Sequence, residues 1–203
     1  STHCISSAAS DVYKRQHERT GSVALKSLEE RGISVRKPDQ VFATIDHIVD
    51  TLPGRGDETM MPSGSQFIES FRESVQREKI NFFDLNTSRQ GIVHVVSPEQ
   101  GIALPGITYI CPDSHTCSLG ALGALAWGVG SSECEHALAT NTLVKKKPKS
   151  MLININGIPK DGVTAKDIIL HLISKHGANG ANGHAIEFQG ETLSLIHISE
   201  PTR

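Results

Sequence analysis

The sequence has few cysteines, few aromatic residues and no long apolar run. Four cysteines in 203 residues are too sparse for a scaffold held together by disulfides. No run of about 18 consecutive apolar residues occurs, so no membrane-spanning helix is predicted. Basic and acidic side chains nearly balance, with a formal net charge of −2, which argues against nucleic-acid binding through a broad positive surface. The composition is otherwise typical of a globular protein, and the chain is long enough for one domain or two small ones.

The two ends of the chain are related to each other through the genetic code. Residues 11–16 can be encoded by GATGTGTATAAGAGACAG, and the reverse complement of that string encodes residues 193–198. The ends of a natural gene have no reason to be inverted copies, and both segments resemble translated sequencing adapters. We therefore expect residues 1–16 and 193–203 to be adapter scars, and we exclude them from the functional argument.

Short apolar runs alternate with amphipathic patterns between the two ends. Strands are predicted at 41–46, 80–85, 92–96, 107–111 and 150–156. Helices are predicted at 64–79, from 132 to about 143, and from 164 to Gly177, with capping pairs Ser63–Gln66, Ser132–Glu135 and Thr164–Asp167. This alternation predicts a three-layer α/β/α fold with a largely parallel sheet.

A lysine-rich stretch with one proline, residues 145–149, follows the second predicted helix. Such a stretch is typical of a solvated connector, so we place a domain boundary there. We expect a first α/β domain over residues 17–147 and the beginning of a second, incomplete α/β domain over residues 148–192.

Histidines with neighbouring carboxylates follow or lie within the predicted strands. Asp46 and His47 close the first strand, His94 lies in the third, and Asp113 and His115 follow the fourth. Open parallel sheets bind ligands outside the carboxyl ends of their strands. Because histidine titrates near neutrality and a carboxylate orients it, the pattern indicates general acid–base chemistry. Each histidine taken alone is equally compatible with a structural role.

Other chemistries find little support. Cys111 and Cys117 flank the Asp113 motif without forming C-x-x-C, and Cys134 is isolated, so buried thiols are expected rather than zinc ligands. Ser114 lacks the Gly-x-Ser-x-Gly surroundings of a hydrolase nucleophile. Neither a P-loop nor a complete dinucleotide-binding fingerprint occurs.

Six motifs, in order along the chain, resemble the aconitase superfamily. They are VFATIDH at 41–47, GIVHVVSPEQG at 91–101, LPG at 104–106, DSHT at 113–116, GSSE at 130–133 and GVTAKD at 162–167. Within the superfamily, the large-subunit family of isopropylmalate dehydratases matches best. The resemblance implies a cytoplasmic hydro-lyase of leucine biosynthesis, which dehydrates a hydroxy acid and rehydrates the unsaturated product with the hydroxyl group moved.

The resemblance also implies roles for individual residues. The catalytic residues would be Asp46, His47, His94, Asp113, His115 and Glu187, arranged as the pairs Asp46–His47, His94–Asp113 and His115–Glu187, with Ser114 contacting a substrate carboxylate. The first pair would help to protonate the leaving hydroxyl group. The parent enzyme would carry a [4Fe–4S] cluster and bind a small-subunit partner and a small hydroxy acid, but neither nucleic acid nor a membrane.

The sequence departs from the superfamily pattern in its cysteines. The family holds its cluster with three cysteines, two of them in a C-x-x-C, and this chain has no C-x-x-C. We therefore expect the cluster ligands outside the chain, and an N-terminal fragment that is inactive alone and binds no cofactor. Alternatives are a dehydratase for a homoaconitate-, dimethylmalate- or citraconate-type acid, a small metal-dependent enzyme, and a non-catalytic truncated product.

Overall fold

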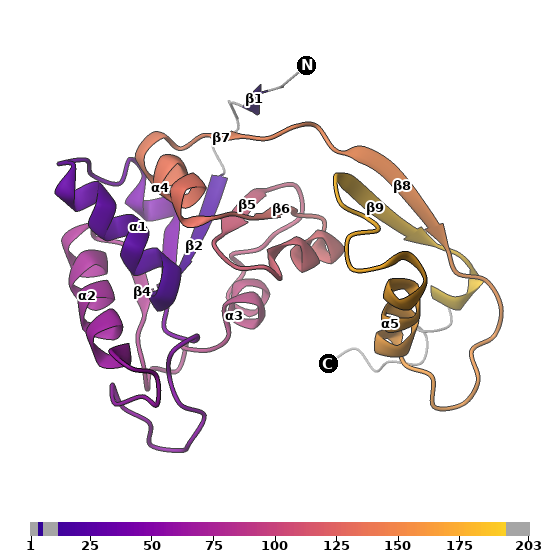
Figure 1. Cartoon of the computed structure of the whole chain (residues 1–203), viewed down its shortest axis with the longest axis horizontal. Coiled ribbons are helices and arrows are strands. Elements are labelled where there is room, and N and C mark those ends of the chain that lie inside the picture. The colour runs from indigo at the N-terminus through magenta and orange to yellow at the C-terminus, as the bar shows by residue number, and fades with distance from the viewer. Residues whose placement is uncertain (1–3, 6–11, 194–203) are drawn as a thin grey trace. The chain divides into compact units, whose positions relative to one another are not determined.

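The computed structural model describes residues 4–5 and 12–193, which divide into two compact units (Figure 1). The first unit spans Cys4–Lys145, and residues 146–193 belong to the second. The division falls within the lysine-rich stretch. Most of the two segments interpreted as adapter scars, residues 1–3, 6–11 and 194–203, lies outside the described residues. Within the described ranges, no helix has the length and apolar character needed to cross a membrane.

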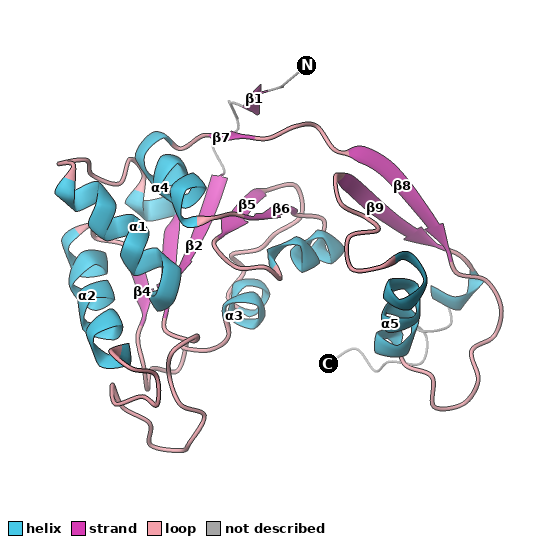
Figure 2. Ribbon diagram, in the orientation of Figure 1, coloured by secondary structure: helices cyan, strands magenta, loops and turns pink. Residues whose placement is uncertain are grey.

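Five parallel strands form the sheet of the first unit (Figure 2). They are β2 (Val12–His17), β3 (Val41–Thr44), β4 (Asn81–Phe83), β5 (Thr108–Cys111) and β6 (Leu125–Gly128). Their spatial order is β4-β3-β2-β5-β6, so the chain builds outward from β2 on one side and then on the other. The strand order reverses at β2, and doubly wound sheets bind ligands at this switch point. A short antiparallel pair, β1 (Cys4–Ile5) with β7 (Leu143–Val144), lies outside this sheet.

Helices cover both faces of the sheet (Figure 1). One face carries α1 (Glu18–Glu30), α2 (Gly64–Arg77) and α4 (Ser131–Thr140), the other carries α3 (Val93–Glu99) and the 3-10 helix η2 (Thr116–Leu122), and the 3-10 turn η1 (Pro38–Gln40) leads into β3. Each face has its own apolar cluster, with Leu25 and Phe71 in the first and Val96 and Tyr109 in the second. The three-layer α/β/α fold predicted from the sequence is confirmed.

The second unit contains β8 (Lys149–Asn154), α5 (Ala165–His176) and β9 (His184–Gln189), with the two strands paired in parallel. The predicted cap of α5 is present. The Asp167 carboxylate accepts the backbone N–H of Thr164 at 2.8 Å, and Gly177 follows the last turn. None of the residues of α5 is buried, and Ile173 and Phe188 are exposed. The described part of this unit therefore lacks a buried apolar core of its own.

Four of the five predicted strands correspond to β3, β4, β5 and β8, but the strand predicted at 92–96 is wrong. These residues enter helix α3 instead. Val93 and Val96 are buried while Val95 is exposed, which is the spacing of a helix packed on one side. A short segment with four apolar residues among five fits a strand and a buried helical turn equally well, so the pattern could not separate the two.

The predicted helices correspond to α2, α4 and α5, but two of the predicted caps are wrong. Ser63 has a left-handed backbone with φ 60°, and its side chain makes no capping hydrogen bond. Helix α4 begins at Ser131, and the Glu133 carboxylate accepts the N–H of Gly130 at 3.3 Å. Glu135 instead forms an ion pair with Arg31.

Candidate functional site

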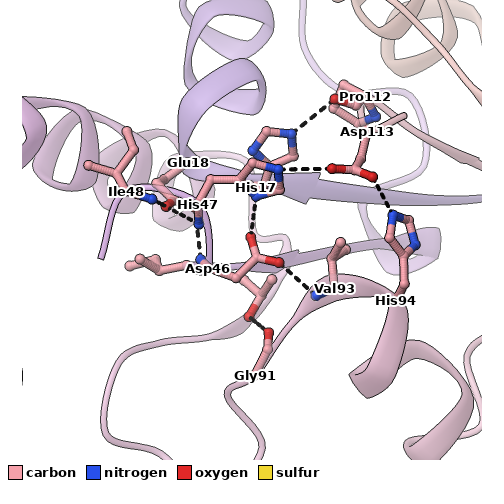
Figure 3. Close-up of polar contacts among 12 residues, drawn as sticks. His17, Glu18, Asp46, His47, Ile48, Gly91, Val93, His94, Pro112 and Asp113 are labelled. Atoms are coloured by element: carbon pink, nitrogen blue, oxygen red, sulfur yellow. Dashed lines mark hydrogen bonds and ion pairs between the residues drawn. The ribbon is translucent and has the colours of Figure 1, made fainter. Parts of the chain in front are cut away.

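The carboxyl ends of β2, β3 and β5 gather histidines and carboxylates around one point (Figure 3). His17 is the last residue of β2, Asp46 and His47 follow β3, and Asp113 follows β5. His94 is added from the first turn of α3. The cluster therefore occupies the switch point of the sheet, where the strands leading away from β2 on either side leave a place for a ligand.

His47 lies between two carboxylates. Its Nδ1 is 2.7 Å from Oδ1 of Asp46, and its Nε2 is 2.9 Å from Oδ2 of Asp113. Both ring nitrogens must carry a proton to donate to two carboxylates, so this geometry requires the imidazolium. The hydrogen bond to Asp46 is the main reason that the pKa of His47 rises to about 9, against the opposing effect of partial burial. The side chain of His47 is 27% exposed, which leaves a proton-bearing ring accessible to a ligand.

Asp113 joins two histidines. Its Oδ1 accepts Nε2–H of His94 at 2.6 Å and the backbone N–H of His115 at 2.8 Å, while its Oδ2 faces His47. Burial alone would raise the pKa of Asp113. The hydrogen bonds from the His115 backbone, His94 and His47 outweigh burial and hold that pKa well below its usual range. Asp113 is therefore ionised, and its two oxygens connect His47, which follows β3, with His94 on α3.

The segment before α3 is tied to the end of β3 by polar contacts. Oδ2 of Asp46 accepts the backbone N–H of Val93 at 2.6 Å, and the Gln90 side-chain amide donates to the carbonyl of Ile45 at 2.6 Å. The Thr44 hydroxyl donates to the carbonyl of Gly91 at 3.2 Å. These contacts set where α3 begins, and hence where His94 is presented to Asp113.

Ser114 and His115 form the exposed edge of the site. The His115 side chain is 81% exposed, and its Nδ1 lies 3.2 Å from the Ser114 hydroxyl and 3.4 Å from Oδ1 of Asp113. Glu187, its expected partner, lies on β9 in the second unit and is exposed. The pairing of His115 with Glu187 stays a prediction, because the two residues belong to separate units.

Gly128, the last residue of β6, leaves room for the turn that carries Asp113. A Cβ at this position would lie 2.6 Å from the backbone carbonyl oxygen of Asp113. We expect Gly128→Ala to displace the turn and lower the kcat/KM of the complete enzyme by about 100-fold, because a misplacement of about 1 Å has an effect of that size. Gly120→Ala is the control, since a Cβ there meets no atom within 4 Å. Equal activity of the two variants in a steady-state assay would show that the close approach of Gly128 to the Asp113 carbonyl does not contribute to activity.

Two residues of the site, His17 and Glu18, were missed by the sequence analysis. The His17 ring stacks on the His47 ring, with 3.7 Å between centroids and an interplanar angle of 15°. Its Nε2–H donates to the carbonyl of Pro112 at 3.0 Å, and burial lowers its pKa. Glu18 accepts backbone N–H groups at the end of β3. A His-Glu dipeptide directly before an amphipathic helix was the available signal, but it adjoins the segment that had been set aside.

The cluster could be mistaken for a metal site, because donor atoms of His17, Glu18, Asp46 and His47 lie within 4.8 Å of one another. Most of these donors are already occupied, the exception being Nδ1 of His17, which has no hydrogen-bond partner among the described residues. The oxygens of Glu18 accept backbone N–H groups, those of Asp46 accept His47 and Val93, and both nitrogens of His47 donate to carboxylates. A cation here would have to break this network, so proton chemistry fits the arrangement better than metal ligation.

Comparison with known proteins establishes the family. The family model described as the aconitase family (aconitate hydratase) matches residues 8–201. The chain belongs to the aconitase family. Among curated relatives, it is 42% identical to the 3-isopropylmalate dehydratase large subunit of Roseiflexus castenholzii, over 91% of this chain and 40% of the relative. It is 47% identical to the 3-isopropylmalate dehydratase of Rhizopus niveus, over 90% and 25%. It is 43% identical to the 3-isopropylmalate dehydratase large subunit 1 of Bradyrhizobium diazoefficiens, over 90% and 38%. The chain therefore spans about two fifths of the length of the two large subunits.

Proteins of the aconitase family generally bind a [4Fe–4S] cluster, but the described cysteines of this chain do not fit one. Burial raises the pKa of the Cys111 thiol, and burial raises that of Cys134 to about 12. Sγ of Cys134 donates to Oε1 of Gln16 at 3.1 Å, so that thiol is held protonated inside the core. Of Cys111, Cys117 and Cys134, only Cys117 is exposed. A cluster needs several accessible thiolates, which this part of an aconitase-family protein does not offer.

Proposed function

We propose that this chain is part of the large subunit of a 3-isopropylmalate dehydratase. Such a hydro-lyase interconverts 2-isopropylmalate and 3-isopropylmalate by removing and re-adding water, a step of leucine biosynthesis. Family membership and the names of the relatives support the proposal. The observation that carries it is the His47 ring held between the carboxylates of Asp46 and Asp113 at the switch point of the sheet.

His47 would act on the hydroxyl group. In the dehydration, the C–O bond breaks, the oxygen keeps the electron pair, and a proton from His47 converts the leaving group to water. Asp46 keeps the ring oriented through Nδ1, and its negative charge stabilises the imidazolium before the transfer. The proton on the neighbouring carbon goes to a base that we place outside this chain. In the hydration direction the same steps run in reverse, and His47 regains its proton from water.

The remaining site residues would hold the substrate and the proton network. Asp113 accepts hydrogen bonds from both His47 and His94, and so would hold the two rings in place. The exposed Ser114 hydroxyl is placed to contact a substrate carboxylate. We keep the pairing of His115 with Glu187 as part of this proposal.

The parent protein would supply what this chain does not contain. We place a [4Fe–4S] cluster on cysteines outside the chain, where it would act as a Lewis acid, and we include a small-subunit partner, which the name "large subunit" of two relatives supports. We place the enzyme in the cytoplasm. We further propose residues 17–147 as the first domain, residues 148–192 as the start of a second, and residues 1–16 and 193–203 as adapter scars.

The test is an activity assay on the parent enzyme. The gene is extended past residue 192 from genomic DNA, and the protein is co-produced with its small subunit and reconstituted with iron and sulfide. We expect hydration and dehydration of the isopropylmalates, and no turnover by the 203-residue chain alone. Faster turnover of a homoaconitate-, dimethylmalate- or citraconate-type acid would reassign the substrate. Activity of the short chain alone would overturn the fragment hypothesis.

A further inference from the structure

Glu18 places a carboxylate inside the protein, directly behind the site. It is the first residue of α1, immediately after β2, and it is 0% exposed. Burying a charge without partners is strongly unfavourable, so a carboxylate at this depth needs several donors. Its donors are three consecutive backbone N–H groups, which belong to Asp46, His47 and Ile48.

The geometry of these contacts suits a carboxylate specifically. Oε2 accepts the N–H of Asp46 at 3.0 Å, and Oε1 accepts those of His47, at 2.6 Å, and Ile48. The three groups lie where the chain leaves the sheet, since β3 pairs with its neighbours only as far as Thr44. A glutamine has a single acceptor oxygen and would leave at least one of these buried groups facing an NH₂ group.

We propose that Glu18 is a positioning residue, whose carboxylate fixes the Asp46–His47–Ile48 turn and so holds the His47 ring between Asp46 and Asp113. His17 provides a second link from the end of β2. Its ring stacks on His47, which follows β3, and its Nε2–H donates to the carbonyl of Pro112, which follows β5. The His17–Glu18 dipeptide therefore links the ends of β2, β3 and β5. Glu18 itself is too deeply buried to touch a substrate.

A positioning role has an electrostatic consequence for His47. The titratable groups that face the His47 ring are Asp46, Asp113, Glu18 and His17. Burial raises the pKa of Glu18, and the backbone N–H groups that it accepts oppose that rise. In its ionised form, Glu18 adds its negative charge to that of the two aspartates and favours the imidazolium. Replacing the carboxylate by a neutral group should therefore lower the pKa of His47 as well as loosen the turn, which a residue with a purely structural role elsewhere would not do.

The experiment uses Glu18→Gln in the 203-residue chain, with Glu133→Gln as the matched control. Glu133 also accepts a backbone N–H at the start of a helix, but it lies at α4. By NMR, Glu18→Gln should speed hydrogen exchange of the amides of residues 46–48 by about tenfold or more, the equivalent of one lost hydrogen bond. It should also lower the pKa of His47. Glu133→Gln should change neither quantity. Unchanged exchange and unchanged titration in Glu18→Gln would overturn the proposal.

Two further measurements keep the proposal testable. If Glu18→Gln does not fold, scalar couplings across hydrogen bonds between the Glu18 carboxylate carbon and the amide nitrogens of residues 46–48 are measured in the wild-type chain, and their absence overturns the proposal. In the parent enzyme, whose function is itself proposed above, Glu18→Gln should lower kcat with little change in KM. A parent without isopropylmalate activity would refute the proposed function and leave the NMR result on Glu18 standing.

Discussion

His47→Gln in the complete enzyme is expected to lower kcat by about 10²- to 10⁴-fold, the usual contribution of a well-placed general acid. Glutamine is close in size and still donates one hydrogen bond, but it carries no transferable proton at neutral pH. KM should change little, because the lost interaction acts in the transition state rather than in substrate binding. The measurement is steady-state turnover of isopropylmalate.

His171→Gln is the control for this variant, because His171 is an exposed residue of α5. It should retain full activity. The kcat of Asp46→Asn should lie between those of His47→Gln and His171→Gln. This variant leaves the imidazole in place but removes the carboxylate that does most to raise its pKa. If His47→Gln kept turnover within about threefold of the wild type, below even the weakest acid catalysis, the assignment of His47 as the proton donor would be wrong.

Arg15→Ile is expected to stabilise the first unit by about 1–4 kcal/mol, by analogy with the gain found when buried ion pairs are replaced by packed apolar residues. Arg15 lies in the central strand, is 0% exposed, and burial lowers its pKa. Its three guanidinium nitrogens have no hydrogen-bond partner among the described residues. The guanidinium stacks on Phe83 at 4.9 Å, a contact that offsets only part of the cost of burial. Thermal unfolding should show a Tm higher by several degrees.

Arg19→Ile is the matched control, since Arg19 is exposed and its replacement should leave Tm almost unchanged. A lower Tm for Arg15→Ile would show that the arginine is well accommodated in the sheet. The expected gain in stability follows from the proposal that residues 1–16 are foreign: a strand not selected for this position would place a charge in the core. Lys14 differs from Arg15 because it donates a hydrogen bond to Asn141.

The strand ends and their histidine motifs could be predicted from sequence because the signal is local. The run before Asp46 and the run before Asp113 each form a strand that turns at the expected place. The contact between His47 and Asp113 could not be predicted this way, because it depends on β3 and β5 both flanking β2. Periodicity identifies strands but does not give their order in the sheet.

Two errors have different physical causes. His94 was placed on a strand, but it lies on a helix because Val93 and Val96 pack against the sheet three residues apart. The sequence does not predict the central strand β2, because most of its residues belong to the segment interpreted as an adapter scar and because Lys14, Arg15 and Gln16 do not form an apolar run. Without β2, the sequence also does not predict the site roles of His17, its last residue, and Glu18, the first residue of α1. Neither residue belongs to the excluded segment.

The central claim is that the fold holds His47 as an imidazolium between two carboxylates, and the NMR titration of its ring protons in the 203-residue chain tests it most directly. The pKa should lie near 9, compared with about 6.5 for an unperturbed histidine. Because the folded pKa is the higher one, the protonated His47 stabilises the fold fully below pH about 6.5, and this contribution is lost as the pH rises through 9. Asp46→Asn should lower the value. A pKa at or below 6.5 in the wild-type chain would contradict the account.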